Sequence, residues 1–186
     1  FHEFGHALHG LLSDVTYPTL SGTSVVRDFV ELPSQVMEHW LEIREVLEKF
    51  ALHYQTGQLM PKELITKIER ASKFNQGFAT VEYLASALVD MKAHLVTDRP
   101  VDPPAFEKET LAALGMPREM VMRHRLPQFL HLFGGDGYSA GYYSYLWADT
   151  LSADAFEAFM ETKDPFNPEV AAKLKKHIFS VGNSLD

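Results

Sequence analysis

The sequence has no cysteine, no long apolar run and no strongly basic segment. Without cysteine there are no disulfide bonds and no thiolate metal ligands, although a cysteine-free protein can exist in either redox environment. We expect a cytoplasmic location, with the periplasm as the alternative. No apolar stretch approaches the roughly 18–20 residues that span a bilayer, so we expect no membrane partner.

Basic residues are also few. The chain has 17 Lys and Arg against 25 Asp and Glu, which gives a formal net charge of −8. Its densest basic cluster consists only of Lys173, Lys175 and Lys176. Proteins that bind nucleic acid usually concentrate positive charge on one face. We therefore expect no nucleic-acid partner.

What the sequence does contain is helical periodicity. Its 186 residues are 46% hydrophobic, which is enough for the core of one domain. Apolar residues recur at helical spacing, without the alternation that is typical of a strand, so we predict an all-α fold in one continuous unit. The expected segments are a helix at 1–13, a turn-rich stretch at 14–32, helices at 33–54, 61–72 and 76–96, a helix ended by Gly115, a Gly- and aromatic-rich loop at 126–141, and helices at 142–160 and 171–179.

The most informative motif is His2-Glu3-Phe4-Gly5-His6. Histidines four residues apart on a helix differ by about 40° around its axis and about 6 Å along it, so both imidazoles can reach one ion. Zinc accepts imidazole nitrogens, and a carboxylate at the position of Glu3 can take a proton from water beside the metal. Gly5 weakens a helix, which indicates close approach of another element. The motif predicts zinc hydrolysis, although histidines on helices also occur by chance.

A catalytic zinc site needs a third protein ligand, and Glu31 is the best candidate among the downstream acids. It lies 29 positions after His2, at the start of the next long helix, and an antiparallel helix pair would return it to the histidines. The alternative is an acidic residue that stabilises a helix N-terminus. Spacing alone leaves both interpretations open. Asp28 could orient one imidazole, or it could pair with Arg27.

Further motifs accompany these residues. They are His2-Glu3-Phe4-Gly5-His6-Ala7-Leu8-His9, Ser21-Gly22-Thr23, Arg27-Asp28-Phe29-Val30-Glu31, Pro33-Ser34-Gln35, Phe74-Asn75-Gln76-Gly77-Phe78 and Gly141-Tyr142-Tyr143-Ser144-Tyr145-Leu146-Trp147. Together they resemble the thimet oligopeptidase family of zinc peptidases over nearly the whole chain. The resemblance implies one zinc ion per chain, Glu31 as its third ligand and short peptides as substrates.

Within that family the likeness is to bacterial peptidyl-dipeptidases, also called dipeptidyl carboxypeptidases, more than to oligopeptidase A. It rests on Leu8-His9-Gly10-Leu11 and Gly182-Asn183-Ser184. The resemblance implies a multi-helix, zincin-like half of a larger helical peptidase domain. The chain begins at Phe1, directly before the metal motif, so we expect a piece of a longer enzyme whose N-terminal part forms the other wall of a channel. The sequence leaves open whether such a piece is active alone.

The Gly- and aromatic-rich segment is a candidate for substrate binding. Tyr138, Tyr142 and Tyr145 are spaced by four and three, so on a helix they would share one face. Ordinary aromatic packing is the alternative. The preceding glycines would let phenols move onto a substrate. The resemblance implies that Tyr145, with Tyr142, donates to the oxyanion and that His131 and Tyr138 hold the peptide backbone.

We therefore predict one catalytic-domain fragment over residues 1–186. Its expected parts are a zinc-binding helix pair at 1–54, a helical middle at 61–122, the substrate-binding loop and helix at 126–160, and a C-terminal helix at 168–180. Release of C-terminal dipeptides is the first functional hypothesis. The alternatives are an endopeptidase like oligopeptidase A and an inert helical scaffold that retains a metal site.

Overall fold

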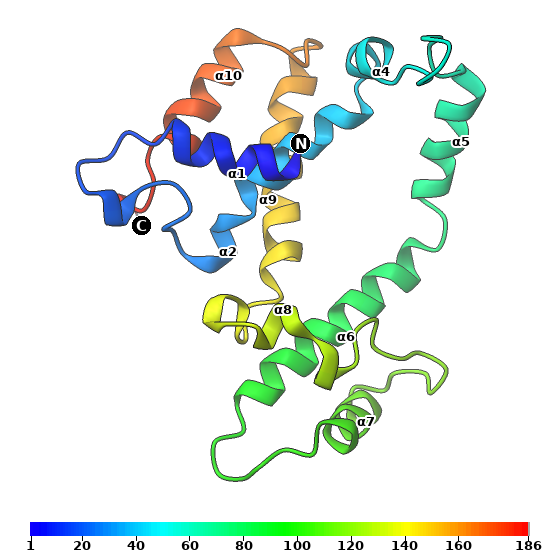
Figure 1. The fold of residues 1–186 in the computed structure, drawn as a ribbon, viewed down its shortest axis with the longest axis vertical. Helices are drawn as coiled ribbons and strands as arrows, with labels where there is room; N and C mark the ends of the chain where they lie inside the picture. Colours follow the sequence, from blue (N-terminus) through cyan, green and yellow to red (C-terminus); the bar gives the residue numbers. More distant parts are fainter. Residues whose placement is uncertain (186) are drawn as a thin grey trace. The chain divides into compact units, whose positions relative to one another are not determined.

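The computed structural model describes residues 1–185, and their regular structure is helical (Figure 1). Within this range the only strand-like pairing is an isolated antiparallel bridge between Leu52 and Leu59. No helix in the described range is both long enough and apolar enough to cross a membrane. The all-α prediction is confirmed.

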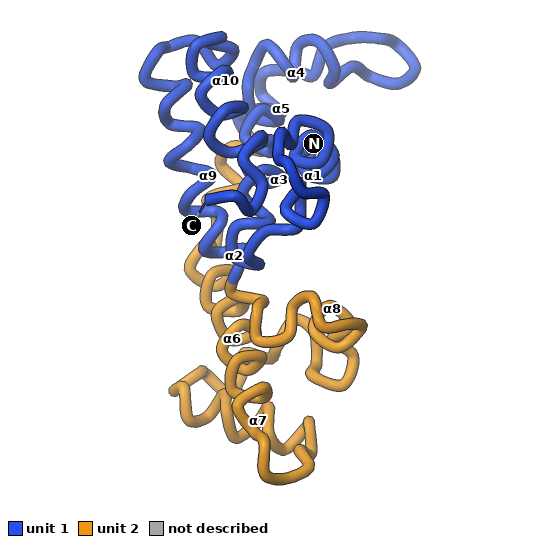
Figure 2. The backbone as a smooth tube through the Cα atoms, turned by 90° about the vertical axis from the view of Figure 1, so that its left-hand side faces the viewer, with its two compact units in different colours: residues 1–66, 144–186 blue, residues 67–143 orange. Residues whose placement is uncertain are grey.

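The chain divides into two compact units (Figure 2), and the boundaries fall within α5, after Thr66, and just before Ser144. Unit 1 comprises residues 1–66 and 144–186, and unit 2 comprises residues 67–143. The prediction of a single catalytic domain stays a prediction. The elements of unit 1 are α1 (His2–Leu11), η1 (Pro18–Leu20), α2 (Arg27–Val30), α3 (Leu32–Glu38), η2 (His39–Glu42), α4 (Arg44–Phe50), the start of α5 (Lys62–Ser72), α9 (Ser144–Glu161), α10 (Pro168–Leu174) and the π-helical turn η5 (Lys175–Phe179).

Unit 1 is organised around the contact between α1 and α3, and α3 in turn packs against α9. The contact is close because Gly5 has no side chain. A Cβ atom at this position would lie 2.5 Å from both the carbonyl oxygen of Pro33 and the Cα of Ser34. The close approach predicted from Gly5 is confirmed, and it brings the start of α3 against the histidine face of α1.

The predicted continuous helix at 33–54 is wrong. The segment forms α3, the 3-10 turn η2 and α4, with Ile43 in an extended conformation between the last two. Two features account for the interruption. Ile43 is β-branched and favours extended backbone, and the indole of Trp40 donates a hydrogen bond to the Pro165 carbonyl at 2.9 Å. A tertiary contact therefore overrides the helical periodicity of this segment.

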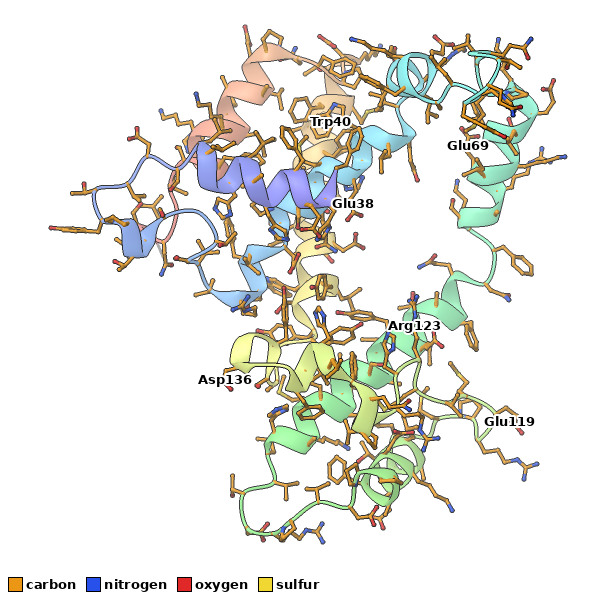
Figure 3. The ribbon with its side chains drawn as sticks, in the orientation of Figure 1. Glu38, Trp40, Glu69, Glu119, Arg123 and Asp136 are labelled. Carbon is orange, nitrogen blue, oxygen red and sulfur yellow. The ribbon has the colours of Figure 1, made fainter. Side chains whose placement is uncertain are left out.

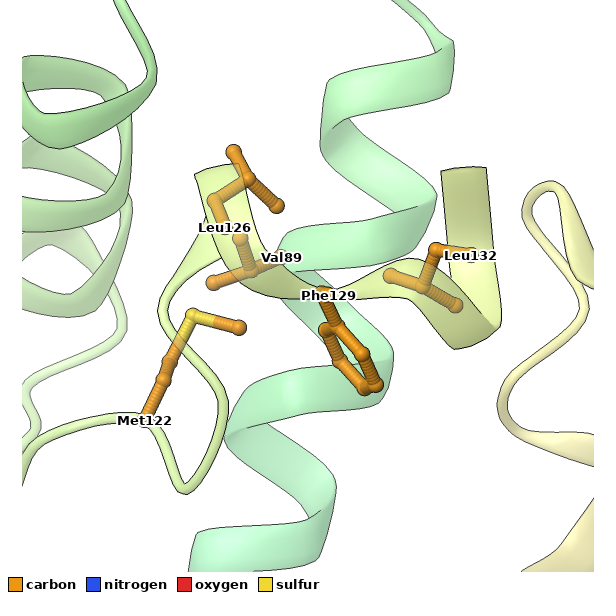
Figure 4. Close-up of a cluster of buried hydrophobic side chains, with 5 residues drawn as sticks. All are labelled: Val89, Met122, Leu126, Phe129 and Leu132. Carbon is orange, nitrogen blue, oxygen red and sulfur yellow. The ribbon is translucent and has the colours of Figure 1, made fainter. Parts of the chain in front are cut away.

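Unit 2 is built on a buried cluster of Val89, Met122, Leu126, Phe129 and Leu132 (Figure 4). Val89 comes from α6 and the others from the chain that follows α7. Burying side chains of this size contributes about 1.5–3 kcal/mol each. The cluster thus fixes the irregular segment that precedes the aromatic residues of interest. The elements of unit 2 are the end of α5, α6 (Gln76–His94), α7 (Pro103–Ala113), η3 (Leu126–Gln128), α8 (Leu130–Phe133) and η4 (Asp136–Tyr138).

Candidate functional site

In unit 1 the side chains of His2, His6 and Glu31 converge. The Nε2 atom of His2 and the Nε2 atom of His6 each lie 3.3 Å from Oε2 of Glu31. The two imidazole rings are 5.0 Å apart between centroids. One candidate ligand atom from each residue lies within 4.8 Å of the others. Helix α1 and the junction between α2 and α3, where Glu31 lies, thus bring three metal-ligating groups to one point.

This donor set fits zinc in kind, and both of its separations to the carboxylate oxygen fit a tetrahedral ion. Two imidazole nitrogens and one carboxylate oxygen are typical of catalytic zinc sites, which keep a fourth position open. Ligand atoms that each lie about 2.0–2.1 Å from one tetrahedral ion are about 3.3 Å from each other. The two Nε2 to Oε2 separations have this value. Glu31 is only 1% exposed, and a carboxylate buried to this degree is usually paired or bound to a cation.

Two further side chains, neither of them predicted from the sequence, hold this arrangement. Glu38, near the start of α1 in Figure 3, lies with Oε1 2.5 Å from Nδ1 of His2. The hydroxyl of Ser34 donates to Oε2 of Glu31 at 3.1 Å. Carboxylates in the position of Glu38 fix the orientation of a metal-ligating imidazole. Both residues follow Glu31 at helical spacing, by three and seven positions, so they could have been found from its register.

Glu3 lies between the two histidines in sequence, on the first turn of α1, and its side chain is exposed. A general base must reach water and must not be consumed as a metal ligand. In the converging group the carboxylate comes from Glu31, which leaves Glu3 as the acid next to the histidines on the same helix. This arrangement is compatible with the predicted role of Glu3, which stays a prediction.

The aromatic residues predicted for substrate binding are divided between the units. In unit 2, the ring of His131 lies 4.4 Å from that of Tyr138 and 5.6 Å from that of Tyr142, between centroids. Burial raises the pKa of Tyr142 above its ordinary value of 10, although Arg123 acts in the opposite direction. Tyr145 belongs to unit 1, where its carbonyl accepts a hydrogen bond from Nε2 of Gln35 at 3.0 Å.

Tyr138, Tyr142 and Tyr145 do not share one helix face, and Tyr138 lies in the segment predicted as a loop. Tyr138 ends the 3-10 turn η4, Ala140 has a left-handed backbone with φ of 55°, and α9 begins only at Ser144. A left-handed residue cannot continue a right-handed helix. Tyr138 and Tyr142 are therefore neighbours through the fold of the loop rather than through helical spacing.

Comparison with known proteins places the chain. Its sequence matches the profile of peptidase family M3 over residues 1–186. The chain belongs to peptidase family M3. This confirms the family resemblance drawn from its motifs.

Curated M3 relatives include dipeptidyl carboxypeptidase of Escherichia coli K12, which is 44% identical over the whole of this chain and 28% of its own length. Oligopeptidase A of the same organism is 42% identical over 99% of this chain and 27% of its own length. Mitochondrial intermediate peptidase of Eremothecium gossypii is 34% identical over 23% of its own length. The M3 chain thus spans about a quarter of the length of the relatives it matches.

A third histidine of the M3 chain's first helix, His9, lies away from the converging ligands. It is fully buried, its ring lies 6.4 Å from that of Phe29 and 6.3 Å from that of Phe179, and neither ring nitrogen has a hydrogen-bond partner among the described residues. Burial, assisted by the nearby His6, lowers the pKa of His9 from 6.5 to about 4. His9 is therefore a neutral packing residue.

This pKa makes the free energy of unfolding depend on pH. Between about 6.5 and 4 the unfolded chain binds a proton at His9 and the folded chain does not, so acidification favours unfolding until about pH 4. Urea titrations of the metal-free full-length protein and its His9→Phe variant should show this. We expect the stability of the wild type, relative to the variant, to decrease as pH falls through that window. A difference that stays constant with pH would contradict the assignment.

Proposed function

We propose that this chain carries the catalytic centre of a zinc-dependent peptidase that releases C-terminal dipeptides from short peptides. The observation that carries the proposal is the convergence of His2, His6 and Glu31, with Glu3 beside the histidines on α1. Membership of peptidase family M3 supports the reaction class. The 44% identity to a protein named dipeptidyl carboxypeptidase supports the mode of cleavage.

In this proposal His2, His6 and Glu31 hold the zinc ion, and Glu38 keeps the imidazole of His2 in position through its Nδ1 atom. When bound, zinc lowers the pKa of water and polarises a carbonyl group. Glu3 accepts the proton of the attacking water and passes it to the leaving amine, which is general base followed by general acid catalysis.

The remaining roles belong to hydrogen-bond donors. Tyr145, together with Tyr142, donates to the oxyanion that forms at the scissile carbonyl, and stabilisation of that charge is commonly a large catalytic contribution. His131 and Tyr138, whose rings are in contact, hold the peptide backbone. The other wall of the substrate channel comes from the rest of a longer chain, since the matched relatives are several times longer.

A second function is favoured by a specific observation, the 42% identity to oligopeptidase A of Escherichia coli. On this alternative the protein cleaves short peptides internally. The two functions differ in whether the free C-terminal carboxylate of the substrate is needed.

One short unstructured peptide, prepared with a free and with an amidated C-terminus, separates them. The zinc-loaded full-length protein is incubated with each form and the products are identified by mass spectrometry. We expect sequential release of dipeptides from the free form and little cleavage of the amidated form. Equal internal cleavage of both forms would favour the endopeptidase. Cleavage of neither form would contradict both functions.

A further inference from the structure

Unit 2 contains a buried carboxylate for which the proposed reaction has no use. Asp90 lies on α6 and is fully buried. Its Oδ1 accepts the backbone N–H of Ala140 at 3.0 Å, and its Oδ2 accepts the backbone N–H of Tyr142, also at 3.0 Å. Oδ1 also lies 2.9 Å from Nδ1 of His94. Both oxygens are therefore engaged, and two of the contacts are to the segment that contains the aromatic residues.

The segment needs such an anchor because its backbone is strained. Ala140 has φ of 55°, in the left-handed region that alanine rarely adopts. A conformation of this kind costs of the order of 1–3 kcal/mol and persists only where the surroundings enforce it. Hydrogen bonds from N–H groups to an ionised carboxylate are about twice as strong as neutral ones. The carboxylate of Asp90 bonds on both sides of Gly141, directly next to the strained residue.

A second residue of α6, Tyr83, holds the same segment through the carbonyl group of Tyr142. The hydroxyl of Tyr83 donates to the carbonyl of Tyr142, and the two rings stack with centroids 5.0 Å apart. Tyr83 and Asp90 are seven residues apart, which is about two helical turns, so they present the same face of α6. Both backbone polar groups of Tyr142 are thus fixed by one rigid helix.

The fixed position of Tyr142 extends to the neighbouring rings. The ring of His131 packs edge-on against that of Tyr142, and the ring of Tyr138 packs against that of His131 with the centroids 4.4 Å apart. A shift of the backbone at Tyr142 would therefore move all three aromatic side chains. A misplacement of about 1 Å in a positioning group can lower the rate by about 100-fold.

We infer that Asp90 is a positioning residue for substrate: its carboxylate sets the backbone of Ala140 to Tyr142 and so the placement of Tyr138, Tyr142 and His131 against the peptide. This inference rests on the proposed function. It requires a carboxylate, because an asparagine amide offers one acceptor oxygen where the segment presents two N–H groups.

Peptide binding tests the inference apart from turnover. We would measure the affinity of a short peptide for the zinc-loaded full-length protein carrying Glu3→Gln, with and without Asp90→Asn. We expect Asp90→Asn to weaken binding about 10-fold or more and, in the protein with intact Glu3, to lower kcat/KM about 10–100-fold, through KM and also through kcat because Tyr142 is the proposed oxyanion donor. Zinc content should not change. Affinity and KM within about twofold of the parent would overturn the inference.

Glu107→Gln is the matched control. Glu107 is also a buried carboxylate of unit 2, and its Oε2 accepts the backbone N–H of Leu126 at 3.0 Å, outside the Tyr138–Tyr142 segment. A general loss of stability in unit 2 would affect both variants, whereas loss of positioning affects only Asp90→Asn. Equal weakening of peptide binding by the control would overturn the inference.

If Asp90→Asn fails to fold, Tyr83→Phe provides the test, since it removes only the hydroxyl that donates to the Tyr142 carbonyl. We expect a smaller loss of peptide affinity in the same direction, and an unchanged affinity would overturn the inference. The proposed peptidase function has a separate test: it is contradicted if the zinc-loaded wild type cleaves no peptide. Peptide affinity tests the role of Asp90 whether or not the wild type cleaves the peptide.

Discussion

Replacing Glu3 by glutamine in the full-length protein is expected to lower kcat/KM for peptide hydrolysis by about 10²–10⁴-fold, while zinc stays bound. Glutamine has nearly the shape of glutamate but cannot accept a proton at neutral pH. The side chain is exposed on the first turn of α1, whereas the converging carboxylate is that of Glu31. The reaction should therefore lose its base and keep its metal. Zinc content by atomic absorption and initial rates on a short peptide measure the two quantities separately.

The matched control is Asp14→Asn. Asp14 is an exposed carboxylate just beyond the end of α1 and outside the converging group. Asp14→Asn changes the net charge by the same amount as Glu3→Gln. We expect activity close to that of the wild type. Substantial turnover by Glu3→Gln would contradict the general-base role. Loss of zinc from that variant would instead indicate that Glu3 helps to bind the metal.

The local part of the site could be predicted from the sequence because it depends on one helix. The four-residue spacing of His2 and His6 fixes their common face wherever α1 lies. Glu31 is different. Spacing left its role open, and its place depends on the close approach of α3 to Gly5, which is a tertiary contact. The resemblance to a known family implied that Glu31 is the third ligand, whereas local spacing could not distinguish a ligand from a residue that stabilises a helix N-terminus.

The aromatic segment shows where sequence periodicity fails. Tyr138, Tyr142 and Tyr145 have helical spacing, but Ala140 is left-handed and η4 and α9 are separate elements. Alanine is the strongest helix former, so nothing in its identity indicates a turn. The conformation depends on the carboxylate of Asp90, which is 50 residues away from Ala140 in sequence. Long-range hydrogen bonds of this kind leave no periodic pattern.

Replacing Glu31 by glutamine should remove both zinc and activity. Oε2 of Glu31 lies 3.3 Å from the Nε2 atoms of both His2 and His6, so it is the group that completes the donor set. A neutral amide oxygen is a weaker ligand for zinc than a carboxylate. Loss of a residue that hydrogen-bonds a metal ligand typically lowers metal affinity by about 10–100-fold. We expect Glu31→Gln, which removes a ligand itself, to lower zinc affinity by more than this. Competition with a chelator measures this affinity.

Glu38→Gln should have a smaller effect than Glu31→Gln. Glu38 is not one of the three converging ligands, and it contacts only Nδ1 of His2, the ring nitrogen that does not face Glu31. This substitution should weaken zinc binding by about 10-fold and leave measurable activity at saturating metal.

Thermal unfolding adds a readout independent of turnover. Since a ligand that binds the folded state stabilises it, zinc should raise the melting temperature of the wild type and of Glu38→Gln but not of Glu31→Gln. Full zinc stabilisation of Glu31→Gln would show that the ion is held elsewhere.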